Sequence, residues 1–257
     1  MSSHRSAFSL VEMSIVLVIL GLLIGGVVAG QSLIYSSSLR KVGADYQKFV
    51  SAVQLFQGEF NALPGDMTNA QSYWGVAHAT AATCVTTAST GTETCNGDGN
   101  GEIGVSTGAN ERFRFWQHLA SAGLIAGNFS GVAGGASTSS AVAANSPGSA
   151  ISNGLWFSNS WGVLSGTSVM DGDFTNALQF GGMRANNNPT VQILRPGDAY
   201  YIDMKIDEGK PGTGILRTNW SGCTVAASSA ETTADYDLDR TTGACLLYFP
   251  RAYGYNS

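Results

Sequence analysis

The feature that most constrains the fold is one apolar run near the N-terminus, residues 8–29, which contains a single charged side chain. An apolar segment of about 20 residues is long enough to cross a bilayer as a helix. The charged side chain is Glu12, at the fifth position of the run. A carboxylate at the centre of such a helix costs roughly 2.5–3.5 kcal/mol on insertion scales, so it usually has a partner and a task. Ordinary signal sequences and membrane anchors have no use for it.

The chain after this run continues as an amphipathic helix. From Leu39 to Phe60, apolar residues recur at alternating steps of three and four, which places them on one stripe of a helix. No proline interrupts residues 8–60, and Leu63-Pro64-Gly65-Asp66 then ends the pattern. The sequence predicts one helix of ~80 Å. Its first half (8–32) lies in lipid or in a bundle of like helices, and its second half (33–60) lies against a globular domain.

The first residues of the run resemble a known processing site. Ala7-Phe8-Ser9-Leu10-Val11-Glu12 is similar to the cleavage site of type IV prepilins and of the pseudopilins of type II secretion. The resemblance implies that a membrane peptidase removes a leader, residues 1–7, by cutting before Phe8, and then methylates the new amine. It also implies that Glu12 becomes the fifth mature residue, where the family carries its glutamate. In a fibre, this carboxylate would neutralise the amine of a neighbouring subunit within an apolar core.

Two positions depart from the family pattern. Ala7 stands where the family usually has glycine, so we expect slower processing. Ala29 stands where many major pilins have a helix-bending proline, so we expect a straighter helix, which favours a minor pilin or a pseudopilin. The resemblance therefore implies a structural subunit of a type IV pilus or of a type II secretion pseudopilus. Its partners would be like subunits or other pilins through the helix, the prepilin peptidase and an inner-membrane assembly platform.

Other interpretations of the N-terminus stay open. Glu12 can also be tolerated near the end of an anchor helix, with its carboxylate at the membrane interface. The chain would then be a monomeric single-pass membrane protein that displays a periplasmic or extracellular binding domain. Val27-Val28-Ala29 satisfies the small-residue rule of signal peptidase, and a cut after Ala29 would release a soluble secreted protein. Arg5 before the run favours an N-in, C-out orientation in a bacterial inner membrane. A fibre subunit would afterwards become periplasmic or extracellular.

The remaining residues, 61–257, predict one globular α+β domain. A helix is expected at residues 111–123, with Phe115 and Leu119 facing inward and Trp116 as a further candidate for the inward face. Five segments have the composition of strands, and they are 154–157, 176–180, 190–194, 199–206 and 245–249. Strands that follow a long helix favour an antiparallel sheet packed on the apolar stripe of that helix, as in pilins.

Composition and motifs exclude several classes of function. Charged residues make up 12% of the chain, the net charge is −5, and no basic cluster follows Lys41, so direct nucleic-acid binding is not expected. The chain has no Gly-x-Ser-x-Gly, phosphate-loop or His-Glu-x-x-His motif. Beyond the leader, its histidines are His78 and His118. The sequence predicts a protein that is not an enzyme and requires no cofactor.

The four cysteines are Cys84, Cys95, Cys223 and Cys245. Their spacing does not fit zinc or redox motifs. An even number in a chain that begins with a membrane-targeting segment indicates disulfides in an oxidising compartment. Three connectivities are open, and we prefer the two local pairs, Cys84–Cys95 and Cys223–Cys245. The second pair would bound a terminal loop that resembles the disulfide-bounded loop of pilins.

Two segments are candidates for binding calcium. The segment 96–103 follows the first eight positions of a calcium loop, with oxygen ligands at alternate positions, then glycine and an apolar residue. Position twelve is Thr107, and Glu111 comes four residues late, as a displaced ligand. An ion-free glycine-rich turn is the preferred alternative. The candidate ligands are Asn96, Asp98, Asn100, Glu102 and Glu111.

The second segment is the acidic stretch within the last disulfide loop. In an extended chain, Asp235, Asp237 and Asp239 face one side. Their repulsion invites either a calcium ion or neutralisation by Arg240. A solvated loop without an ion is the preferred interpretation.

Overall fold

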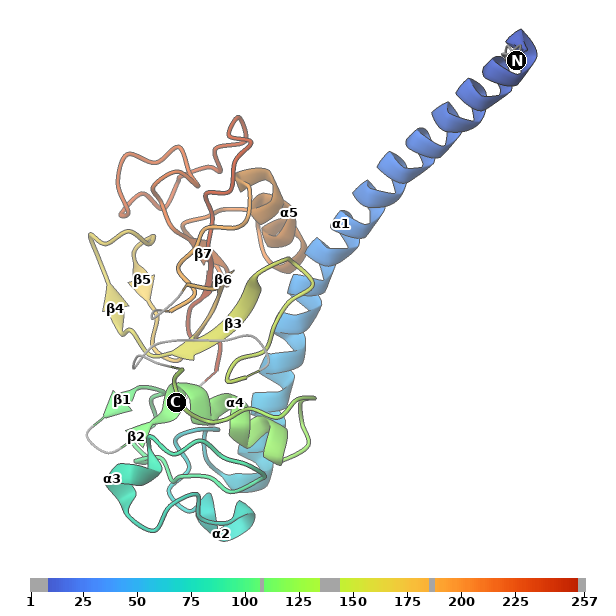
Figure 1. The fold of residues 1–257 in the computed structure, drawn as a ribbon. Coiled ribbons are helices and arrows are strands. Elements are labelled where there is room, and N and C mark those ends of the chain that lie inside the picture. Colours follow the sequence, from blue (N-terminus) through green and yellow to red (C-terminus); the bar gives the residue numbers. More distant parts are fainter. Residues whose placement is uncertain (1–8, 107–108, 135–143, 185–187, 254–257) are drawn as a thin grey trace, which may run out of the picture.

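The structure is a computed structural model that describes residues 9–106, 109–134, 144–184 and 188–253. It consists of one long helix, α1 (Leu10–Phe60), and an α+β domain gathered around the C-terminal part of that helix (Figure 1). The helix has 51 residues and is capped at its C-terminus by Asn61, which has a left-handed backbone and whose N–H donates to the Gln57 carbonyl. The predicted long helix is therefore confirmed.

The two parts of α1 differ in their surroundings. The outer half (residues 10–34) projects away from the domain, and its side chains are exposed except at the half-buried Gly30. The inner half (residues 35–60) buries one stripe against the domain. The buried apolar residues of that stripe are Leu39, Val42, Tyr46, Phe49, Ala52, Val53 and Phe56. The predicted stripe is confirmed, with Phe60 half-buried at its end.

A four-stranded antiparallel sheet packs on the inner half, as predicted. Its order is β3 (Gly154–Asn159), β6 (Ala177–Gly182), β8 (Leu247–Phe249) and β7 (Arg217–Thr218). Aromatic rings join the sheet to the helix. The Tyr46 ring stacks on Phe249 with centroids 4.2 Å apart, and the Phe49 ring meets the edge of Trp156 at 5.5 Å. The core of the domain therefore lies between the sheet and the stripe of α1.

The remaining elements are short. The helix α4 (Glu111–Ser121) confirms the helix predicted at 111–123, and Phe115, Trp116 and Leu119 are all fully buried. Gly123 follows it with a φ of 72°, which suits a helix C-terminus. The other short elements are α2 (Gln71–Trp74), α3 (Ala81–Cys84), β1 (Val105–Ser106), β2 (Ala109–Asn110), β4 (Val163–Leu164) and β5 (Gly172–Asp173).

The strands predicted at 154–157, 176–180 and 245–249 correspond to β3, β6 and β8. The strand predicted at 190–194 forms only isolated bridges, one from Val191 to Gly182 and one from Leu194 to Cys245. These two bridges do not make it a strand of the sheet.

The strand predicted at 199–206 is wrong, because this segment belongs to the helix α5 (Pro196–Ile206). Arg195 has an extended backbone, and Pro196 opens the helix with a φ that is already helical. The Asp198 carboxylate accepts from the Arg195 N–H at 3.4 Å and so caps the first turn. The apolar and aromatic residues of the segment favoured a strand, whereas its start signal and its packing on α1 favour a helix.

The helix α5 runs alongside α1 in the same direction. The Tyr35 hydroxyl donates to the Asp198 carboxylate at 2.6 Å, and the Arg40 Nε donates to the Tyr201 hydroxyl at 2.9 Å. Further along, the Ile206 side chain lies opposite Gly43. These contacts mark where α1 enters the domain (Figure 1).

Two disulfides are present, Cys84–Cys95 and Cys223–Cys245, which is the pairing preferred from the sequence. The first closes a loop against α4. The buried Arg114 side chain of α4 donates to the carbonyls of Cys84 and Thr87 at 2.9 and 2.8 Å. These bonds hold the loop on the domain.

Candidate functional site

The outer half of α1 presents a long, continuous series of exposed apolar side chains. Its large apolar side chains are between 48% and 87% exposed from Leu10 to Leu20, and the apolar pattern continues to Ile34. By length and composition it is a helix that can cross a membrane, with a mean hydropathy of 2.6 in its most apolar window. A contiguous exposed apolar surface of this kind marks contact with a membrane or another protein. This N-terminal helix fits membrane anchoring.

Glu12 lies in the first turn of this surface. One carboxylate oxygen accepts from the Ser9 N–H at 2.8 Å, and the Ser9 hydroxyl accepts from the Val11 N–H at 3.3 Å. The two side chains cap the start of α1, where a negative charge also suits the helix dipole. Within this chain, the partner of Glu12 is thus the backbone next to the predicted cleavage point. Ala7 and Phe8 themselves lie outside the described residues.

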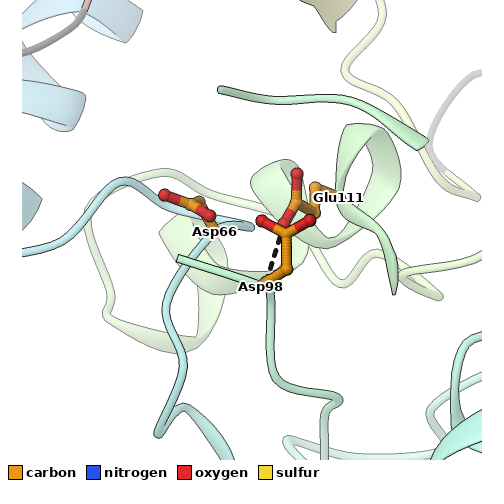
Figure 2. Close-up of side chains that lie close together, drawn as sticks. All are labelled: Asp66, Asp98 and Glu111. Carbon is orange, nitrogen blue, oxygen red and sulfur yellow. Dashed lines mark hydrogen bonds between the residues drawn. The ribbon is translucent and has the colours of Figure 1, made fainter. Parts of the chain in front are cut away.

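A second site is formed by three carboxylates in the domain. Asp66, Asp98 and Glu111 bring one oxygen each within 4.8 Å of one another (Figure 2). Asp66 follows the end of α1, Asp98 lies in the predicted calcium loop, and Glu111 opens α4. Asp66 and Glu111 are buried, with 4% and 1% of their surface exposed, whereas Asp98 is exposed. Oxygen ligands with this arrangement are the kind that hard divalent cations prefer.

Backbone N–H groups hold these carboxylates in place. The two oxygens of Asp66 accept from Asn100 and Gly101, at 3.0 and 2.9 Å. One oxygen of Glu111 accepts from the Asp98 N–H at 3.0 Å, the bond drawn in Figure 2. Its other oxygen accepts from the Gly104 N–H at 3.1 Å. The cluster therefore fastens the loop to both neighbouring segments.

The electrostatics of the cluster favour a bound positive charge. Burial, together with the nearby charges of Asp66 and Asp98, raises the pKa of Glu111 to about 8, although two backbone hydrogen bonds act in the opposite direction. Burial also raises the pKa of Asp66. Carboxylates whose charged form is this unfavourable take up a proton or a cation. The same residues can thus hold either one at neutral pH.

Only part of the predicted ligand set meets at the cluster. The displacement of Glu111 has a structural reason, because the short β1–β2 hairpin returns the chain before α4 begins. Asn96 is used elsewhere, since its side-chain oxygen accepts from the Gln71 N–H at 2.9 Å. The side-chain oxygen of Asn100 accepts from the Glu102 N–H, and a carboxylate oxygen of Glu102 accepts from the Ser160 hydroxyl. The loop is thus stabilised largely by its own turns.

Asp66 was missed by sequence reasoning. It lies 30 positions before the loop and belongs to the segment assigned only as a helix stop. Gly97 makes the approach possible, because a Cβ at this position would lie 2.3 Å from the Gly65 carbonyl oxygen and 2.4 Å from backbone atoms of Asp66. No local pattern reveals such a contact between two segments.

The acidic stretch at 235–239 is not a cluster in the structure. The Asp235 carboxylate accepts from the Lys210 Nζ at 2.5 Å and is exposed. Within the described residues, Asp235, Asp237 and Asp239 do not form a group of carboxylates close enough to share an ion. The solvated loop remains the better interpretation.

His118 has a structural role in the core. It is fully buried in α4, and burial lowers its pKa to about 3, so the ring is neutral. Its Nδ1 accepts from the Gly65 N–H at 2.9 Å. This contact positions the turn that carries Asp66.

Comparison with known proteins gives one finding at the N-terminus. Residues 2–28 match the family model described as the prokaryotic N-terminal methylation motif. No curated protein and no solved structure matches the chain. The matched segment contains Glu12 and most of the outer half of α1.

Proposed function

We propose that this chain, whose residues 2–28 are the prepilin-type cleavage and methylation segment of type IV pilins and pseudopilins, is a structural subunit of a type IV pilus or a type II secretion pseudopilus. The observation that carries the proposal is the position of Glu12. It lies in the first turn of an exposed apolar helix that continues without interruption into the core of the domain. Segments of this kind belong to structural proteins, so we expect no catalytic activity.

The chemistry of assembly follows from the two ends of the predicted cut. Cleavage before Phe8 creates an amine, and N-methylation leaves that amine positively charged. In a fibre, the Glu12 carboxylate of one subunit would pair with the amine of its neighbour, while the outer halves of α1 pack together. The pair offsets a desolvation cost that neither charge could bear alone. Pairing with a neighbour also gives the carboxylate a task beyond its bond to Ser9.

The expected location and partners of the protein follow from the same N-terminal segment. We expect the precursor in a bacterial inner membrane with its N-terminus inside and its domain outside, where disulfides can form. Its partners would be the prepilin peptidase, an assembly platform and like subunits. The assembled fibre would be periplasmic or extracellular.

The mature N-terminus separates this proposal from its alternatives. Mass spectrometry of the cellular protein is expected to find a methylated Phe8 as the first residue. An intact leader would instead support a monomeric single-pass protein with a displayed binding domain. Gly30 as the first residue would identify a secreted protein and contradict both.

The assembly step is tested with Glu12→Ala. We expect normal cleavage but at least a tenfold loss of the chain from purified filaments, because an unpaired amine in an apolar core costs several kcal/mol. Glu59→Ala is the matched control, since Glu59 is an exposed carboxylate near the other end of the same helix. Filaments that contain Glu12→Ala at the wild-type level would show that the charge pairing is wrong.

We also propose that Asp66, Asp98 and Glu111 hold a calcium ion. The specific support is the convergence of three carboxylates of which two are buried. Calcium at about 1 mM, the range of weak extracellular sites, is expected to raise the Tm by about 3–6 °C over a chelator control. Asp98→Asn is expected to abolish the shift, and Asp237→Asn to keep it.

Two outcomes would contradict this calcium site. If only Asp237→Asn lost the rise in Tm with calcium, the calcium site would be assigned to residues 235–239. A Tm that does not respond to calcium, together with a Glu111→Gln variant more stable than the wild type at pH 8, would show that a proton satisfies the cluster.

A further inference from the structure

A polar cavity lies beside the last turns of α1, at the end of the helix opposite the exposed apolar segment. Its volume is about 450 Å³. The cavity is lined by four separate parts of the chain: the end of α1, the loop after Gly97, the turn before β6 and the segment after β8. The side chains that matter here are Gln54, Gln57, Asn100, Glu102, Asn176 and Arg251. A volume in this range is that of a small-ligand site.

The lining has a chemical character that excludes several ligands. It combines four amide side chains with one carboxylate and one guanidinium, so its formal charges cancel. Amides offer donors and acceptors together, whereas Glu102 accepts and Arg251 donates. A phosphate or nucleotide would need more positive charge, and a lipid would need apolar walls. The mixture of neutral donors and acceptors suits a neutral ligand rich in hydroxyl groups.

Two of the amide side chains that line the cavity are held in fixed positions. Asn176 has a φ of 50°. Its side-chain oxygen accepts from the Ile103 N–H at 2.8 Å, and its Nδ2 donates to the Gly101 carbonyl at 2.7 Å. Asn100 is likewise held by its bond to the Glu102 N–H. A site whose polar groups are already placed loses less entropy when a ligand binds.

Three other side chains keep hydrogen-bonding capacity for a ligand. The Gln54 side chain is exposed and makes no hydrogen bond to another residue within the described part of the chain. Glu102 uses one carboxylate oxygen for Ser160, which leaves the other available. The Arg251 Nη1 lies 3.8 Å from the Asp173 carboxylate, and 72% of the arginine side chain is exposed. The fixed amides, together with these three available side chains, form a site that can bind adjacent hydroxyls.

We propose that this cavity binds a carbohydrate unit of about one or two sugar rings, a size that fits the volume. Gln54, Glu102 and Arg251 would make the hydrogen bonds to its hydroxyl groups. Gln54 lies 26 positions beyond Val28, or ~39 Å along the helix, so the site is well separated from the segment that fits the membrane. The proposal goes beyond assembly, because it concerns what the domain binds.

The test uses the full chain in detergent and saturation-transfer NMR with free glucose, galactose, mannose, N-acetylglucosamine and galacturonate, and with inorganic phosphate in a separate titration. At least one neutral sugar at about 10 mM is expected to receive saturation, with a Kd in the millimolar range. Gln54→Ala and Arg251→Ala are each expected to weaken binding at least fivefold. Gln47→Ala is the control, an exposed amide of α1 outside this cavity.

Glu102→Gln keeps the shape of the side chain but removes its charge and replaces one acceptor oxygen by an NH2 donor, so it changes the hydrogen bonds to a ligand without removing side-chain volume. We expect weaker sugar binding with an unchanged near-UV spectrum. The proposal is overturned if no neutral sugar receives saturation, or if the cavity variants bind as the control does. Binding of galacturonate and phosphate alone would also overturn it, because it would assign Arg251 to an anion site.

Discussion

The outer and inner halves of α1 belong to one continuous helix but have opposite relations to the rest of the chain. The outer half is apolar on every face and exposed, whereas the inner half is apolar on one stripe and buries that stripe in the domain. A helix that is apolar all round requires a lipid or protein environment that this single chain does not supply. The domain therefore packs on the inner half alone, and we expect assembly to depend on the outer half of the same helix.

The largest expected difference is between two substitutions that shorten one side chain in each half. Phe49→Ala removes a ring that packs against Trp116 and Trp156, with centroids 5.0 and 5.5 Å away. We expect it to lower the free energy of unfolding by about 3–5 kcal/mol. Leu23→Ala removes a side chain that is 60% exposed, and we expect a change below about 0.5 kcal/mol.

Urea denaturation of the detergent-solubilised chain, followed by tryptophan fluorescence, measures both values. Equal losses from Phe49→Ala and Leu23→Ala would show that the two halves do not act separately in stability. A stable Leu23→Ala that fails to enter filaments would instead strengthen the separation.

The contrast between the halves could be predicted from sequence because it is a local pattern. Apolar residues at steps of three and four define the stripe from Leu39 to Phe60, and unbroken apolarity defines the outer half. The segment 199–206 was misassigned because its aromatic and aliphatic residues also suit a strand. Its helical start at Arg195 and its packing beside α1 decided the outcome.

The candidate metal cluster could be predicted only in part. Asp98 follows the ligand spacing of a calcium loop, and the late position of Glu111 was recognised without the hairpin that explains it. Asp66 was missed because its approach depends on a contact between the end of α1 and the loop at Gly97. Contacts between distant segments leave no periodic signal in one sequence.

The second test concerns α5, the helix that packs on the inner half of α1. The Tyr236 hydroxyl donates to the buried Asp203 carboxylate of α5 at 2.7 Å, which ties α5 to the Cys223–Cys245 loop. Burial raises the pKa of Asp203 to about 7, with the charges of Asp207 and Glu208 acting in the same direction, while bonds from Tyr236 and Gly209 oppose it. A raised carboxyl pKa means that the folded protein holds the proton more tightly than the unfolded chain.

The stability contributed by this protonation is complete below about pH 4 and is lost as the pH rises through about 7. We expect Asp203→Asn to remove about 2 kcal/mol of this pH dependence, measured as the difference in free energy of unfolding between pH 5 and pH 8. Asp235→Asn, in the exposed part of the same loop, is the control. If Asp203→Asn keeps the pH dependence of the wild type, the dependence of the free energy of unfolding arises from other groups, of which Glu111 is the first to examine.

The third test locates the boundary between the halves. The Tyr35 hydroxyl donates to the Asp198 carboxylate at 2.6 Å, four residues before the first buried residue of the stripe, Leu39. Tyr35→Phe removes this bond alone, and we expect a loss of about 0.5–1.5 kcal/mol by urea denaturation. A double-mutant cycle with Asp198→Ala checks the origin of the loss. A coupling energy near zero would place the boundary closer to Leu39.

The smallest expected effect comes from two glycines of α1, Gly26 in the outer half and Gly43 in the inner half. A Cβ at Gly43 would lie 3.5 Å from the Ile206 side chain, which is ordinary van der Waals contact, whereas a Cβ at Gly26 would meet nothing within 4 Å. Replacing a glycine inside a helix by alanine gains about 0.5–1 kcal/mol of helix propensity. Gly43→Ala is therefore expected to raise the free energy of unfolding of the domain by about that amount. Gly26→Ala is expected to leave it unchanged, because its gain stays within a segment that the domain does not need. An equal gain from both substitutions would mean that the whole of α1 folds as one unit with the domain, and that the two halves differ in their surfaces but not in their stability.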